Sequence, residues 1–472
     1  MQLPWSTARH IVKRGLFFGD MLKVLTHPDY ARLFAAQVIA LTGTGLLTVG
    51  LGLLAYDLAA DRAGAVLGTA FAIKMVAYVG LAPVAGAVVG FVPRKAVLIG
   101  ADMVRAAAAL CLPFVDAVWQ IYALIFVLQA ASATFTPTFQ AIIPDVLPVE
   151  ADYTRALSLS RIAYDLESLA SPALAGALLL VISYHGLFAG TVVGFACSAA
   201  LVWRTRIPGA VSSTGHGFAQ RLTRGMRIYL ATPRCRGLLA LNLTAAAAGA
   251  FVIVNTVVVV RSGYGAGEAG VAVALAAFGA GSMAVALALP PLLDRLADRG
   301  VMMVAGAVIS GLIMALSAVM AGGVPDWWVL LGFWAALGAG YSAVLTPTGR
   351  LLRRSAGAAD RPALFAAQFA LSHVCWLLTY PLAGALGQAW GMAPALAVLA
   401  VVALAGVWAA WRVWPPEKSV IAHRHDDLPK DHPHLAEHPP RGGHHAHVFT
   451  IDDLHPVWPG RGAFPKVSAP RS

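Results

Sequence analysis

Charged residues are scarce in this chain. Asp, Glu, Lys and Arg make up 12% of the 472 residues, and hydrophobic residues make up 58%. A soluble globular domain carries about 25% charged residues, so this composition excludes an ordinary soluble protein. Apolar runs of at least about 18 residues, enough to cross roughly 30 Å of hydrocarbon as a helix, recur along the whole sequence. We therefore expect a polytopic membrane protein rather than a tethered soluble domain.

Other features are also missing. The four cysteines lie far apart without CxxC spacing, which excludes a disulfide framework and a thiolate metal site. The first 32 residues contain five basic residues but no apolar core, so we expect the run near Leu33 to be a retained first helix and not a signal peptide. We find no Gly-rich phosphate loop with its Lys, no HExxH and no Ser elbow. An ATP-driven pump or hydrolase is disfavoured, and we predict neither enzyme activity nor a cofactor.

Hydropathy predicts twelve membrane helices in two sets of six. The first set covers 33–57, 64–91, 96–114, 118–140, 155–183 and 185–204. The second set covers 237–260, 267–292, 301–321, 327–347, 363–387 and 391–414. The predicted fold is all-α, with two six-helix bundles at 33–206 and 237–414.

Basic residues alternate between the loops in a way that tests this count. The N-terminus, the pair Arg94 and Lys95, the segment 204–236 and the loops near Arg295 and Arg350 all fall on one side. The positive-inside rule makes this side cytoplasmic, with both termini on it. The net charge of +11 is then explained by basic loops, without nucleic acid as a partner. The bilayer is the expected partner of a monomer.

The two halves resemble each other. TPTFQAIIP starts at 136 and TPTGRLLRR at 346, 210 residues later, and LAGAL occurs at 174–178 and again at 382–386, 208 residues later. We expect Thr-Pro-Thr to end the fourth helix of each half, and Pro172 or Pro381 to interrupt the fifth. Parallel six-helix repeats are the architecture of alternating-access carriers, whose substrate sits near the midplane between the halves.

The ends and the middle of the chain are polar. We predict a cytoplasmic N-terminus over 1–32, a cytoplasmic linker over 207–236 and a disordered cytoplasmic tail over 415–472. In the linker, Leu222, Met226 and Tyr229 fall on one stripe, which predicts a short amphipathic helix lying along the inner membrane surface.

Few ionisable residues lie at helix depth. Such residues cost a few kcal/mol on insertion scales, so they face the bundle interior with a partner. Arg161 and Asp165 are four residues apart and can pair, whereas Glu167 is about 200° round the helix from Asp165. The 208-residue offset aligns His373 with Asp165, which suggests a proton-coupling or cation-binding pair on facing helices. A structural salt bridge and an interior histidine are the alternative. Lys74 either neutralises a carboxylate or meets substrate.

Over about 33–414 the chain resembles the major facilitator superfamily. FTPTFQAIIPDVLPVEADYTRALSLSRIAYDLESLASPALAGALL is similar to the fourth and fifth helices of its bacterial efflux branch, which includes siderophore and drug exporters. The family's motif between helices two and three reads here GAVVGFVPRKAVL, in which Gly86, Arg94 and Lys95 fit. Gly90 stands where the family has Asp, and Pro93 where Gly is usual. The acidic half of this charge network is therefore missing.

The resemblance implies a charged gate, for which we name further candidates. The matching loop of the second half, LLDRLADRG, keeps Asp294, Arg295, Asp298 and Arg299, and the offset leaves open which pair corresponds. Asp102 and Arg105 are three residues apart near the inner end of the third helix, where we favour an interhelical gate bridge.

The tail holds a dense group of histidines. HRHDDLPKDHPHLAEHPPRGGHHAH contains eight of the chain's fourteen histidines among four carboxylates, at His423, His425, His432, His434, His438, His444, His445 and His447. Imidazole suits nickel, zinc, cobalt and copper. A histidine-rich C-terminus on such a carrier resembles bacterial nickel-resistance exporters, whereas a solvated tail without function is the plain alternative.

The sequence thus favours a proton-coupled exporter of the bacterial inner membrane, with a divalent transition metal, nickel or cobalt first, as its substrate. Export of a siderophore or an amphiphilic drug is the alternative within transport, with the tail then regulatory. A membrane metal sensor that transports nothing is the rival from another class.

Overall fold

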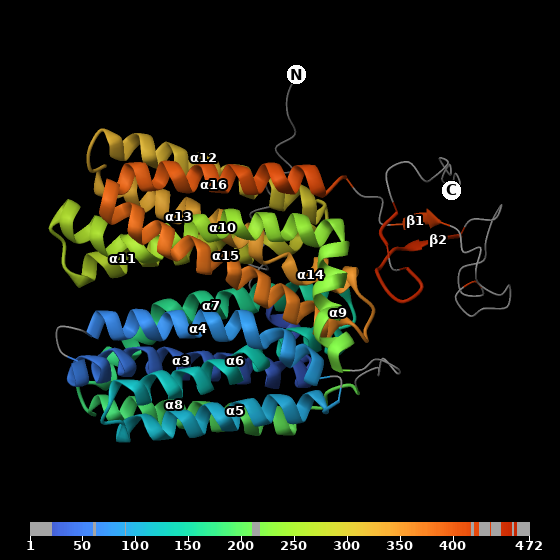
Figure 1. Cartoon of the computed structure of the whole chain (residues 1–472), viewed down its shortest axis with the longest axis horizontal. Coiled ribbons are helices and arrows are strands. Elements are labelled where there is room, and N and C mark those ends of the chain that lie inside the picture. Colours follow the sequence, from blue (N-terminus) through green and yellow to red (C-terminus); the bar gives the residue numbers. More distant parts are fainter. Residues whose placement is uncertain are drawn as a thin grey trace.

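The computed structural model describes residues 21–59, 63–89, 91–209, 218–416, 420–423, 435, 445–455 and 457–459. Long helices lie side by side in two groups, the N-half and the C-half (Figure 1). The N-half contains α3 (Pro28–Ala59), α4 (Ala63–Val88), α5 (Arg94–Cys111), α6 (Val118–Val146), α7 (Glu150–Leu178) and α8 (Tyr184–Arg204). The C-half contains α10 (Pro233–Val258), α11 (Glu268–Leu293), α12 (Asp298–Ala321), α13 (Trp327–Leu345), α15 (Arg361–Trp390) and α16 (Met392–Val413).

Within the described ranges, eleven helices are long and apolar enough to cross a membrane. The remaining long helix, α7, has 29 residues but carries the charges Arg155, Arg161, Asp165 and Glu167 along its length. Its length suffices to span a bilayer at 1.5 Å rise per residue. The predicted all-α fold with two six-helix bundles is confirmed. The charged residues of α7 lower its mean hydropathy below that of the other long helices.

The two halves pack by the same plan. In the N-half, α3 packs on α7 and α8, and α4 packs on α6; in the C-half, α10 packs on α15 and α16, and α11 packs on α13. The equivalent pairs α5 with α8 and α12 with α16 complete the correspondence. This is the parallel repeat that the offsets of 208 and 210 residues predict.

The proline predictions were partly wrong. Thr-Pro-Thr at 346–348 does end α13, and α14 (Thr348–Ser355) follows directly. At 136–138, however, the same motif lies inside α6, which continues to Val146. Pro172 and Pro381 do not interrupt α7 or α15, because both helices run through them. Neighbouring helices satisfy the backbone groups that a proline frees in a membrane bundle.

The predicted linker helix exists as α9 (Phe218–Ala231), but its apolar side does not rest on lipid. It crosses the ends of α4 and α15, from one half to the other (Figure 1). Tyr229 is fully buried and donates a hydrogen bond to Gln368 of α15 at 2.5 Å, while Leu222 and Met226 are half-buried. A Cβ at Gly225 would lie 2.0 Å from the carbonyl oxygen of Ala363. The helix is therefore braced against protein.

The tail prediction also needs correction. Strands β1 (Val420–His423) and β2 (His445–Val448) pair antiparallel, with His423 opposite His445, and the residues after β2 pack on the C-half. A wholly disordered tail therefore does not describe residues 445–455. Of the predicted metal ligands, His445 and His447 both lie in β2, two residues apart. The others, apart from His423, lie outside the described residues: His425, His432, His434, His438 and His444.

Two glycines let α11 and α13 cross with their backbones almost in contact. A Cβ at Gly281 would lie 1.8 Å from the carbonyl oxygen of Ala335, and one at Gly338 would lie 1.9 Å from that of Phe278. Such close crossings at small residues are typical of membrane helix packing, where dispersion contacts replace the hydrophobic effect. They fix Ser282, which follows Gly281 directly, and Tyr341, which lies three residues after Gly338.

We expect Gly338→Val to separate α11 from α13. Overpacking costs about 1–3 kcal/mol in a packed core, and more where the neighbour is backbone. The folded, monodisperse fraction after detergent extraction should fall severalfold, measured by size-exclusion chromatography at graded temperatures. Gly332→Val on the same helix is the matched control, because a Cβ there meets open space. Equal losses in both variants would contradict the crossing.

Candidate functional site

The halves meet along two seams, α7 against α11 and α4 against α15. We call the end of the bundle at which α9 and α14 lie the basic end, and the other the far end (Figure 1). The site has two levels: a group of polar side chains at mid-height of α7, and a layer of ion pairs at the basic end.

The mid-height group joins the halves through the α7–α11 seam. Arg161 and Asp165 form an ion pair four residues apart, and Asp165 is 3% exposed. Ser282 of α11 donates to Asp165 Oδ2 at 2.6 Å and accepts from Arg161 Nε at 3.2 Å. The Arg161 guanidinium also lies 4.9 Å from the ring centroid of Tyr341 on α13. A carboxylate of the N-half is thus solvated by its own arginine and by a hydroxyl of the C-half.

A second polar group lies at the α4–α15 seam. The charges of Glu167 on α7 and Lys74 on α4 attract each other. Lys74 Nζ lies 5.5 Å from the ring centroid of Tyr78. The His373 ring packs edge-on against Tyr78, with centroids 4.7 Å apart, and its Nδ1 lies 2.7 Å from the Phe369 carbonyl oxygen. Of the two roles predicted for Lys74, these contacts fit the one in which it neutralises a carboxylate.

The expected pair of Asp165 and His373 is not brought together. Asp165 bonds to Arg161 of its own helix and to Ser282 of α11. His373 contacts Tyr78 of α4 and Phe369 of its own helix. Pseudo-symmetry does place both residues between the halves, but on opposite seams. The separation of Asp165 and Glu167 into different environments is as the helical spacing predicts.

Asp102 and Arg105 do not bridge the halves. Their ion pair lies within α5, and Asp102 is fully buried. The Arg105 guanidinium is sandwiched between Phe135 of α6 and Phe195 of α8, at 4.2 and 4.5 Å from the ring centroids. All these helices belong to the N-half, so the predicted interhelical gate bridge is a pair inside one bundle, with cation–π contacts to its neighbours.

The basic end is closed by two ion-pair groups that cross between the halves. In the first, Asp145 at the end of α6 binds Arg94 of α5 and Arg361 of α15, each at 2.5 Å. Arg94 was predicted as a gating residue that lacks its acidic partner. Asp145 supplies that partner from a different helix, and it binds an arginine of the other half with its second oxygen.

In the second group, Glu150 at the start of α7 binds Arg350 at 3.0 Å and also Arg354, both on α14. Asp298 of α12 binds the same two arginines at 3.1 and 2.8 Å. Arg350 also donates to Thr154 of α7 at 2.6 Å. Asp298 is therefore the carboxylate of the LLDRLADRG loop that joins the charge network.

The other predicted gating residues lie at the edge of this layer. Asp294 and Arg295 are exposed, and Lys95 is half-buried. Arg299 donates from Nε to the carbonyl oxygen of Trp414 at 2.7 Å, which ties α12 to the end of α16 within the C-half.

Sequence reasoning missed Asp145, Glu150, Ser282 and Tyr341. One signal was present: the 210-residue offset aligns Glu150 with Asp360, two carboxylates that open the fifth helix of each half. Ser282 and Tyr341 carry no charge, so only the fold reveals them.

Asp145→Asn should loosen the basic end. The amide keeps the shape but leaves two arginines without their shared carboxylate, which costs up to a few kcal/mol in buried settings. We would replace exposed Cys111 and Cys197 by Ser, introduce Leu157→Cys beneath α14, and measure maleimide labelling of the purified protein.

The labelling rate should rise about tenfold or more. Asp152→Asn is the matched control, because Asp152 pairs with Arg155 and His27 inside the N-half. Unchanged labelling of the Asp145 variant would argue against a gate at this end.

Comparison with solved structures supports the fold. The chain is similar to the human organic anion transporter MFSD10, with a TM-score of 0.68 and 12% identity over 81% of this chain and 98% of that chain. It is also similar to a bacterial homologue of the iron transporter ferroportin in an outward-facing state, with a TM-score of 0.67 and 15% identity over 81% and 98%.

Curated relatives match by sequence. Macrolide efflux protein A of Streptococcus pyogenes is 26% identical over 204 residues, which is 42% of this chain and 50% of that protein. The protein of the same name from Enterococcus faecalis is 28% identical over 159 residues, 32% and 49% of the two lengths. The chain thus spans about half the length of the curated relatives it matches. The model of the Major Facilitator Superfamily matches residues 33–259 and 238–450. With this match and the two-bundle fold, the chain belongs to the major facilitator superfamily and is a multi-pass membrane protein of a transporter family, not of an enzyme family.

Proposed function

We propose that this protein exports an amphiphilic organic compound in exchange for protons, by alternating access between its two halves. The observation that carries the proposal is the carboxylate of Asp165, which is buried at the seam between the halves and bonded to both of them. The relatedness to macrolide efflux proteins supports export of an organic compound. The basic end would be the cytoplasmic face, as the loop arginines favour.

Proton coupling follows from what Asp165 does in each protonation state. Ionised, it accepts hydrogen bonds from Arg161 and from Ser282, and so holds α7 to α11. Protonated, it loses its attraction for Arg161, and the bond across the seam weakens. An intramembrane carboxylate with these partners is the type of group that relays protons in transporters. Proton uptake from the far end would then allow the seam to rearrange.

The neighbouring aromatic residues support an organic substrate. Phe278, Tyr341, Trp376 and Tyr380 are half-buried and follow one another at centroid distances of 5.6, 6.1 and 4.9 Å. The second ring of this row, Tyr341, contacts Arg161. Aromatic walls with one charged group are typical of sites for lipophilic ions, because ring faces attract cations and bury apolar surface.

A divalent transition metal remains the second candidate, on the ground of the eight histidines at 423–447. The histidine spacings suit nickel or cobalt. In the part of the chain that the structure describes, no group of three metal-ligating side chains comes together. Metal export would therefore depend on ligands beyond the described residues, which makes it the weaker candidate.

Asp165→Asn should abolish proton-coupled transport while leaving folded protein. The amide keeps the hydrogen-bonding shape but cannot titrate. We would measure uptake of a fluorescent lipophilic cation into inside-out vesicles under an imposed pH gradient, and expect a loss of at least tenfold. Asp57→Asn is the matched control, because Asp57 is exposed at the far end and accepts from Tyr184 at 2.5 Å. If a well-expressed Asp165→Asn protein keeps full proton-coupled transport, the proposed role of Asp165 in proton coupling is wrong.

The same vesicles separate the two substrate classes. We expect the lipophilic cation to accumulate, and nickel or cobalt, supplied alone, to stay outside. Replacing residues 424–444 by a short Gly-Ser linker should leave dye uptake unchanged, because these histidines lie in the tail. If the vesicles accumulate metal, and this replacement weakens the accumulation at low metal concentration, metal export becomes the first candidate and export of an organic compound the second.

A further inference from the structure

The segment after β2, residues 449–455 with 457 and 458, packs on the basic end of the C-half. Phe449 and Ile451 are 3% and 1% exposed and belong to the C-half core. His455 is buried, packs edge-on against Phe449 with ring centroids 4.9 Å apart, and bonds to Asp452 at 2.8 Å. Burial opposes ionisation of Asp452, but the bonds from His455 outweigh it and lower the pKa of Asp452. We call residues 449–455, 457 and 458 the docked segment.

Arg234 of α10 joins the docked segment to the end of α14. Its Nη2 donates to the carbonyl oxygens of Phe449 at 2.9 Å and of Arg354 at 2.7 Å, and its Nε donates to Ser355 at 2.8 Å. Trp458 covers its guanidinium at 5.3 Å. Because the guanidinium is rigid and planar, its fork fixes the tail backbone and the end of α14 relative to each other.

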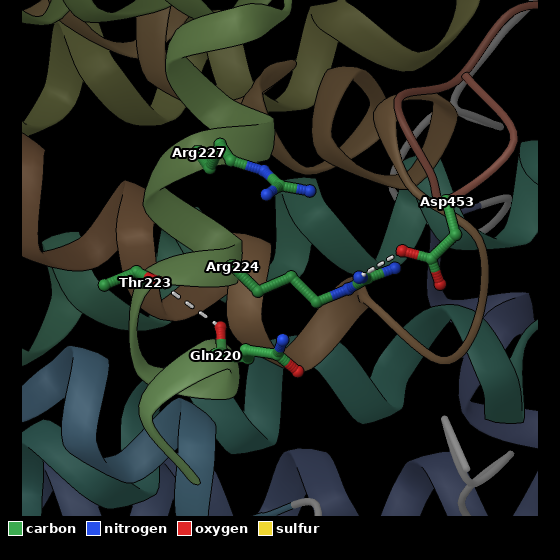
Figure 2. Close-up of a pocket in the computed structure, with 5 residues that line it drawn as sticks. All are labelled: Gln220, Thr223, Arg224, Arg227 and Asp453. Carbon is green, nitrogen blue, oxygen red and sulfur yellow. Dashed lines mark hydrogen bonds and ion pairs between the residues drawn. The ribbon is translucent and has the colours of Figure 1, made fainter. Parts of the chain in front are cut away.

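Arg224 of α9 makes the same kind of connection at Asp360, six residues after Arg354 along the chain. It holds Asp360 with two hydrogen bonds, and Asp453 of the docked segment with a third at 2.7 Å (Figure 2). The bonds to Asp360, and then that to Asp453, raise the pKa of Arg224, so it stays charged at any physiological pH. A pocket of about 190 Å³ lies where α9 meets Asp453.

These two arginines hold both ends of the loop between α14 and α15. We call residues 354–361 the gate loop, because it begins with Arg354 and ends with Arg361. Arg354 binds Glu150, and Arg361 binds Asp145, so each joins the C-half to the N-half. Arg234 contacts Arg354 itself and the next residue, Ser355. Arg224 contacts Asp360, the residue before Arg361.

We propose that the docked segment positions the gate loop, through Arg234 and Arg224, and thereby favours closure of the basic end. The tail then acts as a latch on the transport cycle, with no part in carrying substrate. This inference rests on the alternating access of the proposed function, but on no particular substrate.

The physical reason is the number of constraints on each arginine. With the segment docked, each guanidinium is bound on one side by the gate loop and on the other by the tail. Removing the tail takes these hydrogen-bond acceptors away from buried N–H groups, and an arginine with fewer constraints samples more rotamers. The gate loop then loses its two fixed ends, and Arg354 and Arg361 meet their carboxylates for a smaller fraction of the time.

The test compares the full chain with a chain that stops after Val448. Both carry Leu157→Cys in the background with Cys111 and Cys197 replaced by Ser, and both are purified in nanodiscs without substrate. We expect truncation to raise the rate of maleimide labelling about three- to tenfold. A synthetic peptide of residues 445–459, added to the truncated protein, should lower the rate again. Asp453→Asn alone should raise the rate about twofold.

The control keeps the docked segment and removes the five histidines within residues 424–444. Because His423 lies opposite His445, a four-residue Gly-Ser linker can replace residues 424–444 within a hairpin geometry. This variant should label like the full chain.

Unchanged labelling after truncation would overturn the proposal. So would a raised rate that the peptide does not reverse, since that would assign the effect to loss of folding. Because labelling needs neither substrate nor proton gradient, its outcome is independent of the transport assay.

Discussion

The cost of placing an ionised side chain in hydrocarbon decides where the charges of this protein lie. At a helix centre the cost is about 2.5–3.5 kcal/mol on insertion scales, so a charge must be paired or solvated inside the bundle. The helix α7 carries several such charges, and each has a partner: Asp165 has Arg161 and Ser282, and Glu167 has Lys74. Because Ser282 belongs to α11 of the C-half, meeting the cost at Asp165 also bonds the two halves to each other.

The same constraint acts at the basic end, with one difference. There the carboxylates Asp145 and Glu150 belong to the N-half and most of the arginines to the C-half. Water can replace these partners when the end opens, so the pairs can be reversible. The pair of Asp102 and Arg105, in contrast, is enclosed by aromatic rings of a single half and has no route to solvent by rocking. Burial within one half or between halves thus separates a permanent pair from a gate.

Hydropathy and the internal repeat were enough to predict the twelve helices, the two halves and the interior charges of α7, because these features are local or periodic. Partners across the seam were not predictable, since Ser282 and Tyr341 are ordinary residues until folding places them beside Arg161. The 208-residue offset put His373 between the halves but on the wrong seam, because pseudo-symmetry relates α7 to α15 without making them neighbours. In the tail, the histidines did not predict docking. The signal was the group of apolar residues after β2, namely Phe449, Ile451 and Trp458, which pack on the C-half.

The near-contact of the α11 and α13 backbones has a consequence for the proton coupling proposed at Asp165. Ser282 follows Gly281 directly, and Tyr341 lies three residues after Gly338, so both groups that touch the Arg161–Asp165 pair are mounted on one stiff two-helix unit. Neither can withdraw from α7 without the other. A change in charge at Asp165 would therefore release both contacts in a single step, and the protein would respond to protonation as a switch with two positions instead of a graded spring.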